Sequence, residues 1–287
     1  MKLGVSSYSL FSALKSREID ILGAIEWIAG QGGEHIEIVP LGFSLDEDPN
    51  LVDAIRQKTE EVGMEISNYA IEANFIHSDE KHFELEIERV FKQVEIANRL
   101  GVNLMRHDLA WRPIGETSIQ QFEKDLPKLT DACRRIADYA ATFNITTSVE
   151  NHGYFVQASD RIQSLLHHVN KPNFKTTFDT GNFLCVDENP ITAIKKNISD
   201  ASIIHMKDFY YRHAKRDPGE GWFQTASGNY LRGAIIGHGD IDIYEVLEVI
   251  KNSTYDGYIS IEFEGMEDCK QGTKISLENV HRIWEQI

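Results

Sequence analysis

The feature that most constrains the fold is a regular alternation of short, β-branched runs with longer stretches of helical periodicity. Each run has the residue types and the length of a strand, and the runs lie at 2–7, 34–39, 64–70, 102–107, 144–150, 174–179, 202–207 and 257–263. Their starts are 28 to 42 residues apart, with a last gap of 55 residues. This spacing is typical of strand–helix units rather than hairpins.

Apolar side chains recur at helical spacing between these runs, for example in the stripes at 83–97 and 122–140. Further helices are predicted near 20–30, 50–62, 159–169, 190–198, 242–252 and 273–286, and Gly63 and Gly101 stand where helix-ending glycines are expected. Eight strand–helix units predict an α/β fold, a (β/α)8 TIM barrel that residues 1–287 form as a single domain. A doubly wound open sheet is the rival, but no GxGxxG turn follows the first strand.

The widest gap between strands contains the segment 208–241, which is rich in glycine and aromatic residues. A compact domain seldom keeps a loop of that length without a functional reason. We therefore expect 208–241 to be a long loop over the active site.

Composition narrows the class of function. The formal net charge is −16, with a sequence pI near 5.1, which disfavours nucleic-acid binding because phosphate backbones select basic surfaces. The three cysteines are too few for a disulfide framework, so a reducing cytoplasm is the expected location. No apolar run approaches the length of a membrane span. The sequence thus favours an enzyme for small molecules, with no nucleic-acid or membrane partner.

Active sites of (β/α)8 barrels lie at the carboxyl ends of the strands. Four polar residues lie at or near the carboxyl ends of four successive predicted strands: Glu150, Asp179, His205 and Glu262. Three carboxylates and an imidazole brought together without a cation would repel and be costly to desolvate. The set therefore predicts a divalent metal site. Its oxygen-rich ligands favour Mn²⁺, with Mg²⁺, Co²⁺ and Zn²⁺ as alternatives, since zinc sites more often carry additional His or Cys.

Several of these runs resemble the xylose-isomerase-like superfamily of sugar isomerases and epimerases, which also contains inosose dehydratase and endonuclease IV. The similar motifs are SVENHG (148–153), TFDTGN (177–182), IIHMKD (203–208), GHGDID (237–242) and ISIEFEG (259–265). They cover the second half of the chain, whereas the first half is similar only in its strand–helix rhythm.

The resemblance implies roles for individual residues. Glu150, Asp179, His205 and Glu262 match the family's metal ligands, and Glu150 and Glu262 match its acid–base pair, which acts through a cis-enediolate. The implied function is a divalent-metal-dependent isomerase or epimerase acting on a keto-sugar or a sugar derivative. A metal-dependent dehydratase (lyase) of the inosose or dehydroshikimate type is the alternative, because it shares the enolate chemistry. A non-catalytic sugar-binding subunit is a third hypothesis.

Other residues are candidates for substrate binding. We expect His107 and His152 to contact sugar hydroxyls or to orient the ligands, Lys207 to contact a substrate oxygen, and Trp111, with Trp222, to offer an aromatic platform. Ordinary packing or surface roles are the competing interpretation for each.

The chain also departs from the family. Asn182 stands where several members carry a histidine, which weakens the case for a multinuclear site, and His238 stands where many have glutamate. Cleavage of abasic DNA is therefore disfavoured. Both free and phosphorylated sugars stay open, because a phosphate clamp is available from Arg106, Arg112, Lys207, Arg212 and Arg216. A homo-oligomer also stays open, since dimers and tetramers are common in the family.

Overall fold

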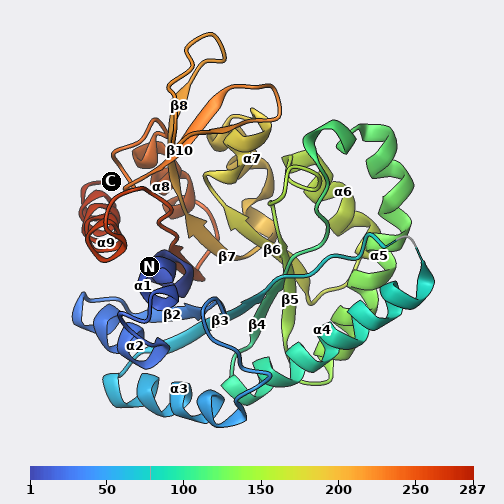
Figure 1. Cartoon of the computed structure of the whole chain (residues 1–287), viewed down its shortest axis with the longest axis horizontal. Coiled ribbons are helices and arrows are strands. Elements are labelled where there is room, and N and C mark those ends of the chain that lie inside the picture. The colour runs from blue at the N-terminus through green and yellow to red at the C-terminus, as the bar shows by residue number, and fades with distance from the viewer. Residues whose placement is uncertain (78) are drawn as a thin grey trace.

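The computed structural model describes residues 1–77 and 79–287. Parallel strands close into an eight-membered barrel in the order β1-β11-β7-β6-β5-β4-β3-β2 (Figure 1). These strands are β1 (Lys2–Ser6), β2 (His35–Ile38), β3 (Glu65–Ile71), β4 (Leu104–His107), β5 (Thr146–Glu150), β6 (Phe174–Asp179), β7 (Ala201–Met206) and β11 (Tyr258–Ile261). Each lies in or within one residue of one predicted run, so the (β/α)8 barrel is confirmed.

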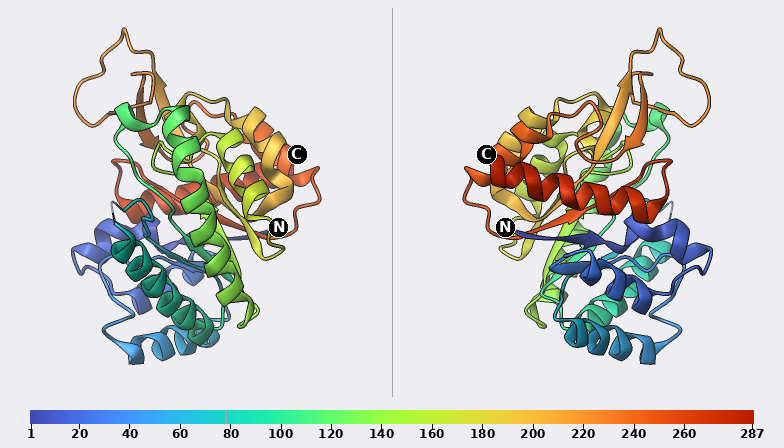
Figure 2. Two further views of the ribbon diagram at one scale, coloured as in Figure 1. Left: turned by 90° about the vertical axis from the view of Figure 1, so that its right-hand side faces the viewer. Right: turned by 90° about the vertical axis from the view of Figure 1, so that its left-hand side faces the viewer.

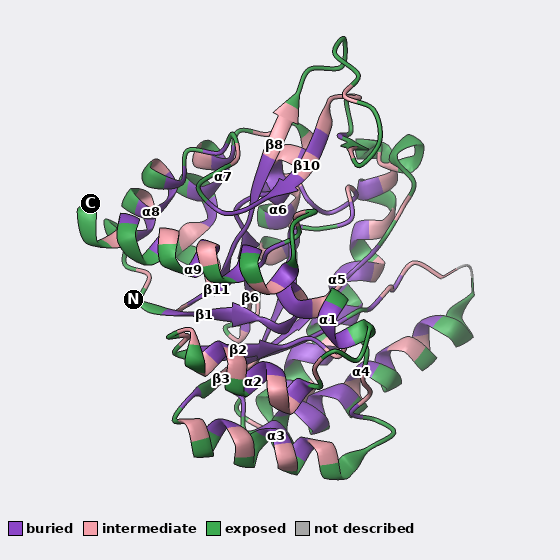
Figure 3. Cartoon of the chain, turned by 60° about the vertical axis from the view of Figure 1, so that its left-hand side comes forward, coloured by how far each residue is buried: buried purple, intermediate pink, exposed green. Residues whose placement is uncertain are grey.

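Helices surround this barrel (Figure 1). They are α1 (Phe11–Lys15), α2 (Ile21–Gly30), α3 (Pro49–Val62), α4 (Glu80–Leu100), α5 (Ile119–Ala141), α6 (Ser159–Val169), α7 (Pro190–Asn197), α8 (Ile243–Lys251) and α9 (Cys269–Gln286). All the predicted helices are present, and among the α-helices of the described residues only the short α1 was not predicted. Their inner faces are buried and their outer faces exposed (Figure 3), as the apolar stripes predict.

Local sequence signals set the helix ends. Asp20 and Asp79 accept hydrogen bonds from backbone N–H groups in the first turns of α2 and α4. Gly63 and Gly101 end α3 and α4 in the left-handed conformation, with φ of 70° and 79°, which glycine adopts without a steric penalty. These short-range preferences fix where each helix stops and the next strand starts.

The barrel closes between its first and last strands. Lys2 is in register with Tyr258 and Val5 with Ile261. Ser9, just after β1, donates its hydroxyl to the carbonyl of Ile261 at 2.9 Å and accepts from the N–H of Phe263 at 2.9 Å. These bonds hold the backbone on both sides of Glu262.

The segment 208–241 is not the plain loop that we predicted. It contains an antiparallel sheet of β8 (Asp208–Arg212), β10 (Tyr230–Ala234) and β9 (Phe223–Gln224), which stands out from the barrel in Figure 2. Gly233 joins it to the backbone after β11, where an added Cβ would lie 2.1 Å from the carbonyl oxygen of Glu264. The alternating pattern in DFYYR and YLRGA is too short to separate strand from loop by sequence.

Among the described residues, no helix combines the length and the apolar character needed to cross a bilayer. The three cysteines, Cys133, Cys185 and Cys269, are buried and unpaired.

Candidate metal centre and active site

Neighbouring strands bring the four predicted ligands together at one end of the barrel. Glu150 and Asp179 are the last residues of β5 and β6, His205 lies in β7, and Glu262 directly follows β11. Side chains alternate along a strand, so each points into the barrel between residues that face the helices. All four are buried, and one ligand atom from each lies within 4.8 Å of the others.

The ring of His205 is oriented by a residue that the sequence analysis missed. His205 Nε2 lies 2.9 Å from Oε2 of Glu37, a fully buried residue of β2. Glu37 also accepts from Asn68 Nδ2 at 3.1 Å and from Ser6 Oγ at 3.2 Å. The other ring nitrogen, Nδ1, is therefore turned toward Glu150 and Glu262, whose carboxylate oxygens lie 3.7 and 3.5 Å away. The available signal was a carboxylate between two isoleucines of the predicted strand EHIEIV.

Two cations neutralise part of the carboxylate cluster. Arg106, from β4, places Nη2 2.8 Å from Oε2 of Glu150. Lys207 places Nζ 2.8 Å from Oε2 of Glu262 and 3.3 Å from Oδ2 of Asp179. Both cations are nearly fully buried, so these ion pairs are only weakly screened by water.

Burial and the ion pairs together give the three carboxylates different pKa values. Burial opposes ionisation of Glu150, but the Arg106 guanidinium prevails and lowers the pKa of Glu150 to about 2. Burial likewise opposes ionisation of Glu262, yet Lys207 and His205 hold its pKa well below the ordinary range. For Asp179 burial prevails over Lys207 and raises the pKa to about 8. Burial lowers the pKa of His205, but Glu37 and Glu262 outweigh it and raise that pKa well above its usual value.

These residues fit a divalent cation. Asp179 Oδ2 and His205 Nδ1 are buried atoms that accept or donate no hydrogen bond, and Asp179 Oδ2 has only the ion-pair contact with Lys207 Nζ at 3.3 Å, although buried polar atoms are normally satisfied. Both belong to the compact set of three carboxylates and one imidazole. Such a donor set suits Mn²⁺, Mg²⁺, Co²⁺ or Zn²⁺.

A cavity of about 430 Å³ opens beside this cluster. Three of the predicted substrate-binding residues, Trp111, His152 and Lys207, line it together with Glu150 and Glu262. The extra sheet contributes Phe209 and Phe223 to its wall, and the segment after β1 contributes Tyr8. Residues 208–241 thus form part of the cavity wall, as a sheet rather than a loop.

His107 does not line this cavity. Its ring is fully buried, lies edge-on to Phe75 with centroids 5.8 Å apart, and uses Nδ1 against the carbonyl of Asp108 at 2.8 Å. The reason is strand alternation: Arg106 faces the barrel interior, so the next residue faces the helices. The prediction that His107 contacts a substrate is therefore wrong, and it is the preceding residue, Arg106, that lines the cavity. Trp222 and His238 also lie outside the residues that line the cavity, and Trp222 packs against Arg212 and Arg232.

Together these features define a class of protein: a (β/α)8 barrel with a candidate divalent-metal site and an adjoining cavity at the carboxyl ends of its strands. The chain belongs to the xylose isomerase-like TIM barrel family, whose model matches residues 25–283. The resemblance inferred from the motifs is confirmed.

Comparison with individual proteins refines this picture. An inosose dehydratase of Clostridium beijerinckii is 24% identical over 156 residues, which are 53% of this chain and 51% of that protein. The match thus spans about half the length of that curated relative. A probable 3-DHS dehydratase, AsbF, from Bacillus anthracis has a similar structure, with a TM-score of 0.77 and 17% identity over 98% of this chain and 99% of that one.

Two further solved structures share the fold. A D-psicose 3-epimerase from Clostridium cellulolyticum H10, solved with D-tagatose, gives a TM-score of 0.73 at 16% identity and covers 99% of both chains. An IOLI protein with a bound zinc atom gives 0.74 at 18% identity, covering 99% of this chain and 96% of that one. The relatives named for an activity are enzymes, and they include both dehydratases and epimerases.

Proposed function

We propose that this protein is a divalent-metal-dependent dehydratase, which removes water from a polyhydroxylated ketone by taking a proton next to the carbonyl and expelling the hydroxyl one carbon further on. The substrate loses one hydrogen and one hydroxyl, and the product is an unsaturated ketone. Mn²⁺ is the cation that we propose for Glu150, Asp179, His205 and Glu262. When bound, it would supply a Lewis acid that makes the adjacent C–H more acidic.

One observation carries this choice over the isomerase that the motifs first suggested. A mechanism with two glutamates needs Glu150 and Glu262 to exchange protons with substrate, yet Arg106 and Lys207 hold both as carboxylates at 2.8 Å. An acid–base group works best when its pKa lies near the working pH. The pKa of Glu150, lowered to about 2 by Arg106 despite burial, is far from that range.

His152 is the better-placed base. It lies two residues after Glu150 and lines the same cavity, and its side chain is 55% exposed. Its Nδ1 is 3.8 Å from Oδ1 of Asp108, a carboxylate close enough to stabilise by its charge the imidazolium that forms on proton uptake.

Two hydrogen-bond donors for the departing hydroxyl line the same cavity. Lys207 offers an ammonium group, whose pKa is raised well above the usual value because nearby carboxylates outweigh the effect of burial. Tyr8 offers a phenol, whose pKa burial raises, so that its hydroxyl stays protonated. The cavity therefore provides a base and two hydrogen-bond donors for the departing hydroxyl. The proton that His152 takes up can leave with that hydroxyl as water, so neither glutamate needs to change protonation state.

Epimerisation or isomerisation through an enediolate is the second candidate. Glu150 and Glu262 both line the cavity, which is the arrangement that a two-glutamate mechanism requires. The two reactions differ in product mass, since dehydration removes one water and epimerisation removes nothing.

The test is incubation of Mn²⁺-loaded protein in D₂O with a panel of inososes, ketohexoses and dehydroshikimate, followed by NMR and mass spectrometry. We expect loss of one water from one substrate class, and a fall of about 10²-fold or more in rate for His152→Asn. His238→Asn, at an exposed histidine that does not line the cavity, is the matched control. Deuterium uptake at unchanged covalent structure would instead establish the epimerase, and activity retained in His152→Asn would remove the proposed base.

A further inference from the structure

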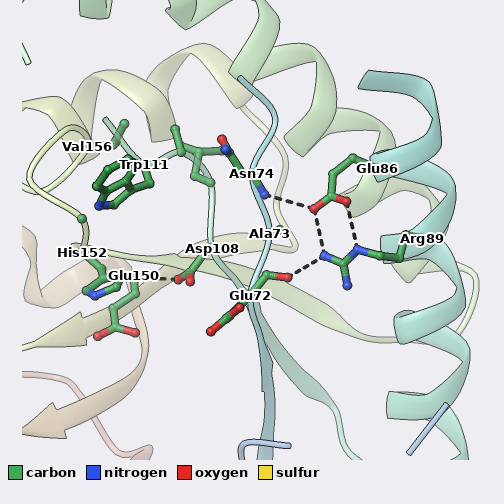
Figure 4. Close-up of a pocket in the computed structure, with 13 residues that line it drawn as sticks. Glu72, Ala73, Asn74, Glu86, Arg89, Asp108, Trp111, Glu150, His152 and Val156 are labelled. Carbon is green, nitrogen blue, oxygen red and sulfur yellow. Dashed lines mark hydrogen bonds and ion pairs between the residues drawn. The ribbon is translucent and has the colours of Figure 1, made fainter. Parts of the chain in front are cut away.

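A second cavity of about 470 Å³ adjoins the one beside the metal site. The two share a wall, formed by Glu72, Asp108, Trp111, Glu150, His152 and Gly153. The second cavity extends outward to Glu86 and Arg89 of α4, as Figure 4 shows. We call the cavity beside the metal site the inner lobe and this second cavity the outer lobe.

The volumes bear on substrate size. Pockets for small ligands have volumes of about 300–1,000 Å³ and enclose most of the ligand surface. The inner lobe alone suffices for one sugar-sized ring, so an outer lobe of similar volume leaves room for a second group of comparable size. A single ring would leave the outer lobe filled with water.

The shared wall carries a largely exposed aromatic side chain. Trp111 is 61% exposed and lines both lobes. Figure 4 shows its indole beside Val156 on the wall of the outer lobe. An exposed indole has an apolar face available to a ligand, and sugar rings offer a matching apolar C–H face. This places an aromatic platform at the junction between the two lobes.

The charges of the lining disfavour an anionic substrate. Four carboxylates besides the proposed metal ligands line the two lobes, from Glu72, Glu86, Asp108 and Glu264. The cations that line them, Arg89, Arg106 and Lys207, each already lie 2.8 Å from a carboxylate oxygen. A phosphate would add negative charge where each lining lysine or arginine is already paired.

The phosphate clamp that the sequence offered does not assemble here. Arg112 Nη2 is 2.7 Å from Oδ2 of Asp125, and Arg212 Nη1 is 3.2 Å from Oδ2 of Asp240. Neither residue lines the inner or the outer lobe, and Arg216 does not line them either.

We infer that the substrate is an uncharged glycoside of two sugar units: the ketose unit, which carries the carbonyl, occupies the inner lobe and a second sugar ring occupies the outer lobe against Trp111. Hydroxyl groups of the second ring meet the carboxylate of Glu72, which lines both lobes. This inference rests on the proposed function for the position of the ketone, but it makes a separate prediction about size and charge.

The test uses three ketoses that differ only in what they add to fructose: D-fructose, lactulose (galactosyl-fructose) and D-fructose 6-phosphate. Calorimetry on the Mn²⁺-loaded protein is expected to give a Kd for lactulose about tenfold lower than that for fructose, and weaker binding of the phosphate ester. In Trp111→Ala the ratio of the fructose and lactulose Kd values should fall to about one. Met266→Ala, at an exposed apolar side chain that lines neither lobe, should leave the ratio unchanged.

The outcomes separate this inference from the proposed function. Tighter binding of lactulose without α-proton exchange in D₂O would support the substrate of two sugar units and count against enolisation. Proton exchange from fructose with lactulose excluded would do the reverse. Preferential binding of fructose 6-phosphate, equal binding of fructose and lactulose, or no binding of any of the three would overturn the inference. A ratio that stays at tenfold in a folded Trp111→Ala protein would remove Trp111 from it.

Discussion

The two halves of the barrel contribute different kinds of group to one cavity. Strands β5, β6, β7 and β11 bring the four candidate ligands. Strands β2 and β4 bring Glu37 and Arg106, which contact His205 and Glu150 at 2.9 and 2.8 Å. The second half thus presents the atoms that face a cation, together with Lys207, which pairs with Glu262 and Asp179, and the first half orients His205 and pairs with Glu150. Residues that would never touch the metal can still determine how well it binds.

The largest effect is expected for a ligand of the second half. In Asp179→Asn, Oδ1 can still accept from the N–H groups of Gly181 and Asn182, so the fold should persist. Stoichiometric metal binding should be lost, and turnover should fall by about 10³-fold or more. Metal analysis and circular dichroism test this, with Asp200→Asn, which lies outside the residues that line the cavity, as the control. Unchanged metal content would show that Asp179 is not a ligand.

A smaller effect is expected from the first half. Glu37→Gln keeps the size of the side chain but removes the charge that orients His205 Nε2, and second-layer changes of this type weaken metal binding about 10- to 100-fold. A competition assay with a fluorescent chelator would measure the Kd for Mn²⁺. Glu65→Gln, at an exposed carboxylate on β3, is the control. If Glu37→Gln binds metal as tightly as the wild type, the division of roles between the halves is wrong.

The pH dependence of metal binding also distinguishes ligands that have a cationic partner from the first half of the barrel from those that do not. Glu150 has a cationic partner from the first half and its pKa is about 2, whereas burial raises the pKa of Asp179 from 3.8 to about 8. Below about pH 8 the cation must displace the proton on Asp179, and His205, whose pKa is raised well above its usual value, must also lose a proton to offer Nδ1. Metal affinity should therefore rise with pH by about ten- to hundredfold per unit between pH 6 and 8. Calorimetry in buffers of different ionisation enthalpy would count the released protons.

The stability of the metal-free protein should also depend on pH, but in the direction opposite to that of metal affinity. Between about pH 4 and 8 the folded chain holds a proton on Asp179 that the unfolded chain has lost, so its free energy of unfolding should fall as pH rises. Urea titrations at several pH values measure this slope. Its absence in Asp179→Asn would assign it to this carboxyl, and an unchanged slope would assign it elsewhere.

The smallest effect is expected outside the barrel. Phe223 of β9 lines the inner lobe and packs edge-on against Phe209, with centroids 5.6 Å apart. Phe223→Ala should raise KM severalfold and leave the Kd for Mn²⁺ unchanged, because the extra sheet contributes no ligand to the metal cluster. Tyr244→Ala, at an exposed aromatic residue of α8 that does not line the cavity, is the comparison variant. A change in metal affinity would mean that the sheet supports the metal site.

Sequence reasoning succeeded where the signal is local. The eight strands, the glycine helix ends and the gathering of Glu150, Asp179, His205 and Glu262 follow from residue type, spacing and barrel geometry. Prediction from the sequence failed where the outcome depends on how strands that are distant in the sequence are placed next to one another. Arg106 and His107 are adjacent, and only the position of β4 in the closed barrel determines which one faces the cavity. Glu37 lies 168 residues from His205, so its contact with that ring has no local signature. The sheet within 208–241 depends on pairing between short strands.

The bonds between Ser9 and the backbone flanking Glu262 have a consequence for the order of folding. These two bonds join residues that are separated by 252 and 254 positions in the sequence. Contacts across such a separation form late, because the intervening chain must already be compact. During synthesis, most of the chain has left the ribosome before Glu262 can meet the other three residues of the cluster. Tight capture of a cation thus becomes a property of the completed barrel, and metal uptake during refolding reports the final step of assembly.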